Sequence, residues 1–297
     1  MLTEFKDRTA VVTGAASGIG LGIARRCGER GMNVVLCDVE AGRLAEAAAT
    51  VGDAARVHTA VVDVSDPQQV QAAADATAER FGPVHLLCNN AGVSMTGRMW
   101  NMTVDDVTWL LGVNIVGVFN GVRSFVPGML EHGQGGHVVN TSSLAGLTPM
   151  ANASLYSGTK AAVVGMSESL LHDLREREAN VGVSVLCPGL VNTNILTSER
   201  NRPGELDETR YRAAGEQVTD FYRNVGSDPL EVGDRVLRAV ERGDFYILTN
   251  EEGRHDIAAR SAALECLGPP PAPRPQAILP DEATDRSGGI PGRPAPS

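Results

Sequence analysis

Short apolar runs alternate with segments of helical length along most of the chain. The runs, rich in valine and other apolar residues, predict seven β-strands at 9–13, 33–37, 56–62, 84–88, 136–141, 182–187 and 245–249. The segments between and after them predict helices at 19–30, 41–51, 67–81, 104–130, 155–178, 207–222 and 229–242. Because every crossover is long enough to be a helix, the strands should lie parallel in one doubly wound α/β sheet, covered on both faces.

Three segments depart from this regular pattern. Inside the predicted helix 104–130, Asn114 and Gly117 both lower helix stability, and Pro127-Gly128 interrupts its far end; such inconsistency is typical of functional sites. Residues 190–226 are polar and irregular apart from one helix. Residues 268–297 are rich in proline and glycine, which predicts a disordered tail after one domain at 1–267, or alternatively a proline-rich segment that binds a partner.

Composition disfavours several classes of protein. A formal net charge of −10 and a pI of about 5.1 disfavour binding to nucleic-acid phosphates. No uninterrupted apolar run reaches the roughly 18 residues of a membrane span, and residues 1–8 lack the basic-then-apolar order of a signal peptide. The five cysteines, odd in number and without a C-x-x-C pair, favour a reduced, cytoplasmic protein. The six histidines show no metal-ligand spacing, so no metal is expected.

A glycine-rich turn joins the first predicted strand to the first helix. Its sequence is Gly14-Ala15-Ala16-Ser17-Gly18-Ile19-Gly20. Glycines allow the backbone to approach a pyrophosphate closely, and the helix N-terminus offers free N–H groups and a positive dipole end. A strand, this turn and a helix in that order predict the first unit of a dinucleotide-binding Rossmann fold.

Asp38 ends the second predicted strand, 18 residues beyond Gly20, where a carboxylate can bind the adenosine ribose hydroxyls. It would repel a 2′-phosphate. No lysine or arginine lies between Gly14 and Gly20, and Val39 follows Asp38, so NAD is expected as the cofactor rather than NADP. Arg43 is expected on the outer face of the next helix. The alternative is that Asp38 is an ordinary solvated turn residue.

Tyr156 and Lys160 are four residues apart, so they share one face of the helix 155–178. A free tyrosine titrates near pH 10 and is a poor base at neutral pH, and a cationic neighbour lowers its pKa. The pair is therefore a candidate for general acid–base catalysis. The alternative is a half-buried helix face whose lysine extends to water.

Over residues 5 to 250 the chain resembles the short-chain dehydrogenase/reductase family. The motifs that carry the resemblance occur in order: Thr13-Gly14-x-x-x-Gly18-x-Gly20, Asp63-Val64, Asn89-Asn90-Ala91-Gly92, the tetrad Asn114, Ser143, Tyr156 and Lys160, and Pro188-Gly189 with Thr193. The resemblance implies NAD contacts at Gly14, Ser17, Gly18, Ile19, Gly20, Asp38, Asp63, Val64, Asn90, Ala91, Gly92, Tyr156, Lys160, Pro188, Gly189, Val191 and Thr193.

The resemblance also implies a role for each member of the tetrad. Tyr156 exchanges a proton with a substrate alcohol or ketone as hydride moves to or from the nicotinamide. Lys160 lowers the tyrosine pKa and binds the nicotinamide ribose, Ser143 orients the substrate oxygen, and Asn114 holds a water that links Lys160 to solvent. Ser142 is the alternative to Ser143, which precedes Tyr156 by the 13 residues usual in the family.

The substrate pocket is expected around an insert at about 190–226 and the loop after the fourth strand. Its apolar and aromatic candidates suggest a bulky, largely apolar secondary alcohol or ketone (aromatic, alicyclic or steroid-like): Val93 to Met99, Met150, Leu190, Ile195, Leu196, Tyr211, Phe221 and Tyr222. Four arginines could meet a substrate carboxylate, although solvated helix charges are favoured for them: Arg200, Arg202, Arg210 and Arg212.

Two helices carry apolar residues on more than one face, and in the family they pair across a two-fold axis. A homo-oligomer, tetramer or dimer, is therefore expected through residues Val107, Leu110, Val118 and Val122 of one helix and Val163, Val164, Leu170 and Leu171 of the other. The alternatives to an NAD-dependent oxidoreductase are an NAD-binding lyase or epimerase, and a non-catalytic NAD sensor or scaffold.

Overall fold

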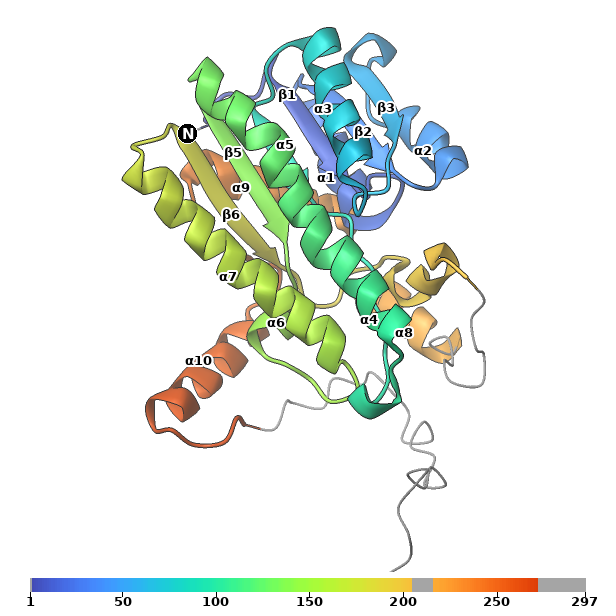
Figure 1. Ribbon diagram of the computed structural model, residues 1–297, viewed down its shortest axis with the longest axis vertical. Helices are drawn as coiled ribbons and strands as arrows, with labels where there is room; N and C mark the ends of the chain where they lie inside the picture. The colour runs from blue at the N-terminus through green and yellow to red at the C-terminus, as the bar shows by residue number, and fades with distance from the viewer. Residues whose placement is uncertain (1, 205–215, 272–297) are drawn as a thin grey trace, which may run out of the picture.

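The described residues form the predicted doubly wound parallel sheet. A computed structural model describes residues 2–204 and 216–271, and its sheet has the strand order β3-β2-β1-β4-β5-β6-β7 (Figure 1). The strands are β1 (Thr9–Thr13), β2 (Asn33–Asp38), β3 (Val57–Val61), β4 (Leu86–Asn89), β5 (Gly136–Thr141), β6 (Val181–Cys187) and β7 (Tyr246–Leu248). The order reverses direction between β1 and β4, which in such sheets opens a crevice at the carboxyl ends of the strands.

Helices cover both faces of the sheet, as the continuous apolar strands require. On one face lie α1 (Gly18–Glu29), α2 (Ala41–Ala48) and α9 (Pro229–Arg242), and on the other α3 (Pro67–Phe81), α5 (Gly117–His132) and α7 (Ser154–Glu176) (Figure 1). Side chains alternate along the strands between these two cores: Val12 faces the first and Val11 the second, and both are fully buried.

The predicted helix 104–130 is built from three pieces. They are α4 (Val104–Leu111), a π-helical turn η3 (Gly112–Val116) and α5, so the irregularity expected at Asn114 and Gly117 is a π-turn. The expected interruption at Pro127 was wrong, because α5 continues through it to His132. By length and mean hydropathy of 1.4, the segment Val104–His132 could cross a membrane, although half of it is buried in the fold. Its packing against α3, β4 and α7 identifies it as a core helix of this sheet protein.

Six other elements of the described residues differ from the sequence prediction or extend it. The short helices η1 (Ala54–Arg56) and α6 (Leu144–Leu147) were missed, as was α10 (Glu252–Glu265), whose apolar residues form no clear stripe. Residues 190–226, expected to be irregular outside one helix, contain η4 (Ile195–Asn201) and α8 (Glu216–Val225), and η2 (Met99–Asn101) follows β4. Residues 205–215, with the start of the predicted helix 207–222, and the predicted tail at 272–297 lie outside the described residues.

A buried polar chain joins β4, β5 and α7 in the middle of the fold. Asn89 donates through Nδ2 to Asn140 Oδ1 at 2.9 Å, Asn140 donates to Ser167 Oγ at 3.0 Å, and Ser167 donates to the Val163 carbonyl at 2.7 Å. Gly121 of α5 packs directly on the same Asn89, since a Cβ there would lie 2.0 Å from Asn89 Oδ1. The close approach of α5 to the sheet therefore depends on a missing side chain.

We predict that Gly121→Ala lowers the free energy of unfolding by about 1–3 kcal/mol, since its methyl group would overlap the Asn89 side chain. Gly128→Ala is the matched control in the same helix, with nothing within 4 Å of its Cβ. It should raise stability by about 0.5–1 kcal/mol through helix propensity. Urea unfolding of both variants is the measurement, and equal effects at the two positions would contradict the packing argument.

Candidate active site

One cavity of about 880 Å³ lies at the carboxyl ends of the strands. Most of the residues predicted to bind cofactor or substrate line it: Gly14, Ser17, Gly18, Ile19, Asp38, Asp63, Val64, Asn90, Ala91, Gly92, Ser143, Tyr156, Lys160, Pro188, Gly189, Val191 and Thr193. Of the predicted cofactor and catalytic residues, which all lie in the described part of the chain, Gly20 and Asn114 are not among those lining it. Both residues are buried behind the residues that line the cavity.

The glycine turn has the backbone geometry that a bound pyrophosphate needs. Gly14 and Gly18 have φ of +64° and +53°, in the left-handed region that favours glycine. Gly20 is required for packing, because a Cβ there would lie 2.2 Å from the Gly14 carbonyl oxygen. Among the described residues, Ser17 makes no side-chain cap to α1, so the helix N-terminus faces the cavity without one. These residues fit a dinucleotide phosphate bound at the helix start.

Asp38 is held in place by backbone donors. Its Oδ2 accepts from Ala16 N–H at 2.9 Å and its Oδ1 from Glu40 N–H at 3.1 Å. Each oxygen keeps a further lone pair for a ribose hydroxyl. Farther along the cavity wall, Asp63 Oδ1 accepts from both the N–H and the hydroxyl of Ser65.

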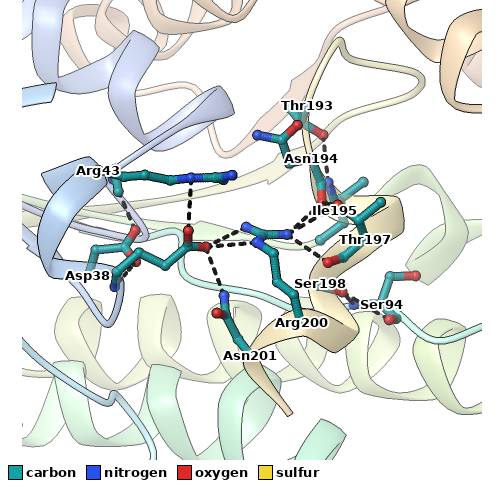
Figure 2. Close-up of polar contacts among 12 residues, drawn as sticks. Asp38, Arg43, Ser94, Thr193, Asn194, Ile195, Thr197, Ser198, Arg200 and Asn201 are labelled. Atoms are coloured by element: carbon teal, nitrogen blue, oxygen red, sulfur yellow. Dashed lines mark hydrogen bonds and ion pairs between the residues drawn. The ribbon is translucent and has the colours of Figure 1, made fainter. Parts of the chain in front are cut away.

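Two basic groups lie near Asp38, although the glycine turn itself contains no lysine or arginine. Figure 2 shows Arg43 and Arg200 reaching one carboxylate beside Asp38. That carboxylate belongs to Glu40, which Arg200 contacts at 2.5 Å, Asn201 at 2.9 Å and Arg43 at 3.1 Å. Arg43 does lie on the half-exposed side of α2, but Arg200 comes from η4, which lies far away in the sequence.

Tyr156 and Lys160 stand on the buried face of α7 and both line the cavity. Lys160 is 3% exposed and donates through Nζ to the Thr141 carbonyl at 2.9 Å. Its Nζ lies 5.8 Å from the centroid of the Tyr156 ring. The alternative of a lysine that extends to water is therefore excluded for Lys160.

The structure separates the two neighbouring serines. Ser142 is buried and donates to the main-chain carbonyl of Lys160 at 2.7 Å, which anchors α7 to the end of β5. Ser143 is only partly buried, lines the cavity and caps α6 by accepting from Ala145 N–H. Burial raises the pKa of Tyr156, and a hydrogen bond with Ser143 partly offsets that rise. This geometry favours Ser143 as the group next to the tyrosine hydroxyl.

Asn114 uses its side chain within the protein. It accepts from Val93 N–H at 2.9 Å and donates to the Val93 carbonyl at 2.9 Å and to Thr159 Oγ1 at 3.0 Å. Thr159 in turn donates to the Tyr156 carbonyl at 2.8 Å. Asn114 therefore connects the π-turn, the loop after β4 and the helix that carries Tyr156.

The pKa shifts differ from the expected direction at Tyr156. Burial raises the pKa of Tyr156 above its ordinary 10.0, and the Ser143 hydrogen bond offsets this only in part. Burial also lowers the pKa of Lys160 to about 8, which the nearby Cys187 opposes. The protein alone therefore does not produce the lowered tyrosine pKa that was expected from a cationic neighbour.

The residues that line the substrate end of the cavity differ in part from those that the sequence predicted. Met150, Leu190, Ile195, Leu196 and Tyr222 line it as predicted, together with Val93 and Ser94, whereas Phe221 and 95–99 are not among its lining residues. Tyr211, Arg210 and Arg212 lie outside the described residues. The lining also includes Trp109, Leu111, Val113 and Val116, which sequence reasoning missed although the π-turn at Asn114 marked their helix.

Arg202 was expected to be a solvated charge, and this was wrong. Its Nη2 lies 2.8 Å from Oδ1 of Asp106, and the two side chains are 9% and 0% exposed. Asp106 also accepts from Thr103 N–H at the start of α4. The pair therefore fixes the end of η4 against α4 at the cavity rim.

Comparisons with known proteins show the family to which this fold belongs. A family model described as short chain dehydrogenase matches residues 8–204, more than half of the chain, so the chain belongs to the short-chain dehydrogenase family. The C alpha-dehydrogenase of Sphingobium sp. is 33% identical over 267 residues, covering 89% of this chain and 87% of that protein. The chain is therefore an oxidoreductase of this family.

Further relatives are similar over most of their length. The 1-deoxy-11-beta-hydroxypentalenate dehydrogenase of Streptomyces arenae is 36% identical over 218 residues, covering 71% of this chain and 77% of that protein. A crystal structure of a short chain dehydrogenase/reductase from Burkholderia phymatum in complex with NAD is 39% identical, with a TM-score of 0.86. It covers 92% of this chain and 99% of that one.

We predict that Tyr156 deprotonates above pH 10.0 in the cofactor-free protein, because burial raises its pKa. The difference in tyrosinate absorbance between wild type and Tyr156→Phe isolates this residue from the other tyrosines. With NAD present, the positive nicotinamide ring should move the titration to lower pH. A titration below 10.0 in the free protein would show that Lys160 acts without help from the cofactor.

Proposed function

We propose that this protein oxidises a secondary alcohol, or reduces the corresponding ketone, with NAD(H) as cofactor. The observation that carries the proposal is that one cavity contains Tyr156, Lys160 and Ser143 at one end and the glycine turn with Asp38 at the other. The helix start at Gly18 would hold the phosphates of a nicotinamide dinucleotide and Asp38 its adenosine ribose, while Tyr156 and Lys160 would lie toward its reactive end.

The bound cofactor supplies the hydride acceptor or donor. Tyr156 takes the proton of the substrate hydroxyl during oxidation and returns it during reduction. Ser143, which hydrogen-bonds with Tyr156, orients the substrate oxygen toward it. Lys160, which donates to the Thr141 carbonyl here, can turn to a ribose hydroxyl and bring its charge near the tyrosine.

In this mechanism, Asn114 positions its neighbours and does not contact the substrate. Its side chain is occupied by Val93 and Thr159, so a water that links Lys160 to solvent would be held by the main chain of the π-turn and not by the amide. A π-turn leaves backbone carbonyls partly released from helical hydrogen bonding. The remaining predicted cofactor residues keep the roles that the family resemblance gives them.

NAD is proposed as the preferred cofactor because the Asp38 carboxylate accepts ribose hydroxyls and repels a 2′-phosphate. The similar protein from Burkholderia phymatum was crystallised in complex with NAD, which supports this preference. One measurement, the net formation of NADH, separates the proposed reaction from lyase or epimerase activity and from cofactor sensing without turnover. Only the dehydrogenase forms NADH in proportion to the alcohol consumed.

The proposed substrate is bulky and largely apolar. Trp109, Leu190, Leu196 and Tyr222 line the substrate end, and burial raises the pKa of Tyr222 to about 12, with Tyr156 close enough to add to the shift. A cavity of about 880 Å³ has room for the cofactor's reactive end and an alicyclic or aromatic alcohol. A related protein is a hydroxypentalenate dehydrogenase by name, which is consistent with a hydroxylated substrate.

We predict that purified protein reduces NAD with apolar aromatic or alicyclic secondary alcohols, and that Tyr156→Phe lowers kcat by a factor of about 10²–10⁴. The ring and its packing remain in this variant, so NADH affinity should stay close to that of wild type. NADH formation and NADH titration by fluorescence are the two measurements. A variant that turns over at the wild-type rate would end the proposed mechanism.

Ser143→Ala and Ser142→Ala provide a matched pair for the same assay. Ser143→Ala should lower kcat without lowering stability much, because its hydroxyl faces the cavity. Ser142→Ala should lower stability instead, since it leaves the buried Lys160 carbonyl without its donor. The opposite result would assign the catalytic role to Ser142.

A homo-oligomer is proposed, through the expected helical segment 104–130 but with other residues in the contact. Leu110, Val118, Val163 and Val164 are buried within this chain, so these four cannot carry the contact. The exposed apolar residues along the same helical segment are Val104 and Phe119, at 80% and 53%, and Leu111 and Val116, at 41% and 39%, which also line the cavity. An exposed apolar strip of this kind fits an isologous contact between two copies.

We predict that Phe119→Glu shifts the protein to a smaller species at micromolar concentration, measured by light scattering. Val61→Glu is the control, since Val61 is 61% exposed on the edge strand β3, away from this helix. A wild-type monomer, or equal dissociation by both variants, would refute the proposed surface.

The proposed organisation is one catalytic domain at 1–267 with a substrate-binding insert at about 190–226. A cytoplasmic location is proposed because Cys27, Cys37, Cys88 and Cys187 are buried free thiols, a state that a reducing compartment maintains.

A further inference from the structure

A single carboxylate joins two arginines at the adenosine end of the cavity. Among the described residues, Glu40 accepts from Arg200 through Nε at 3.0 Å and Nη2 at 2.5 Å, from Asn201 at 2.9 Å, and from Arg43 Nε at 3.1 Å (Figure 2). Its own N–H donates to Asp38. The arginines therefore lie next to the residue that is proposed to bind the adenosine ribose.

The charges in this corner balance. Asp38 and Glu40 contribute two carboxylates, and Arg43 and Arg200 contribute two guanidinium groups. Burial alone would raise the pKa of Glu40, but hydrogen bonds from Asn201 and Arg200 outweigh it and lower the pKa. Glu40 is thus a carboxylate at neutral pH, and its side chain is only 18% exposed.

Arg200 is fixed by more than Glu40. Its Nη1 donates to the Thr197 carbonyl at 2.7 Å and to the Asn194 carbonyl at 3.3 Å, and Arg200 lines the cavity together with Asp38 and Glu40. Without the Glu40 charge, these two carbonyl contacts would keep the guanidinium in the cavity wall. Arg200 would then be available to an anion at Asp38.

We propose that Glu40 is a specificity-determining residue of the cofactor site, because it pairs with Arg200, which lines the cavity and would otherwise be free to bind a 2′-phosphate, and with Arg43 beside it. The inference rests on the proposed preference for NAD. Arginine is well suited to phosphate recognition because its planar group donates two parallel hydrogen bonds. Discrimination against NADP then has two parts, which are repulsion by Asp38 and the pairing of Arg43 and Arg200 with Glu40.

The two parts predict a non-additive response to mutation. In Asp38→Ser the repulsion by Asp38 is gone, but the 2′-phosphate still lies near the Glu40 carboxylate, and Arg43 and Arg200 remain paired with Glu40. In Glu40→Gln the arginines are released, but Asp38 still repels the phosphate. In the double variant a 2′-phosphate meets unpaired guanidinium groups and no carboxylate, so the gain should exceed the product of the single gains.

The experiment measures the ratio of kcat/KM with NADP to that with NAD for wild type, both single variants and the double variant. We expect Asp38→Ser to raise the ratio about tenfold, and the double variant to exceed the product of the singles by about fivefold or more. Adding Arg200→Met to the double variant should remove most of that excess. A general loosening of the η4 loop would change kcat/KM with NAD and with NADP by the same factor, so it would cancel in the ratio.

Glu241→Gln is the matched control, since it breaks an ion pair with Arg30 at 2.6 Å outside the residues that line the cavity, and it should leave the ratio unchanged. Strictly multiplicative single effects, or no effect of Arg200→Met in the double variant, would overturn the proposal. Calorimetric Kd values for NADH and NADPH give the same ratio without turnover. If no alcohol is oxidised, the binding measurements therefore still test this proposal. A wild type that prefers NADP would refute the NAD preference itself.

Discussion

The link between the ends of β1 and β4 is the constraint on which the rest of the site depends. Thr13 Oγ1 accepts from the N–H groups of Asn90 and Ala91, and Asn90 donates through Nδ2 to the Thr13 carbonyl. These bonds lie where the strand order reverses, which is where the crevice opens. Gly20 must be glycine because a Cβ would lie 2.6 Å from Asn90 Nδ2. The link therefore fixes the phosphate turn and the loop beside Lys160 together.

The proton chemistry follows from where this frame places α7. Two contacts at the end of β5 hold Lys160 in the interior. Ser142 donates to the main-chain carbonyl of Lys160, and the Thr141 carbonyl accepts from its ammonium group. Burial makes both charged forms costly, which raises the pKa of Tyr156 and lowers that of Lys160 to about 8. The residues of the proposed acid–base site are thus in place before a cofactor binds. An oxidised nicotinamide bound beside Tyr156 would supply positive charge, which would favour the phenolate form of the tyrosine.

Sequence patterns predicted the sheet, most helices and most of the residues lining the cavity, because these follow from local periodicity and short motifs. They failed where a distant contact decides the outcome. Pro127 remains within α5 because the helix is held by packing on both sides. The partners of Arg202 and Arg200 are Asp106 and Glu40, and no local pattern connects them. The choice between Ser142 and Ser143 likewise needed the Lys160 carbonyl to be located.

The contact between Glu40 and Arg200 spans 160 positions and crosses from the cofactor end of the cavity to the loop that carries Ile195 and Leu196. Arg200 also holds the carbonyls of Asn194 and Thr197, so one guanidinium group orders that loop from inside. A change in charge at Glu40 therefore acts on two surfaces at once. In the proposed site, a substitution at Glu40 would therefore affect both the cofactor preference and the shape of the wall that Ile195 and Leu196 form.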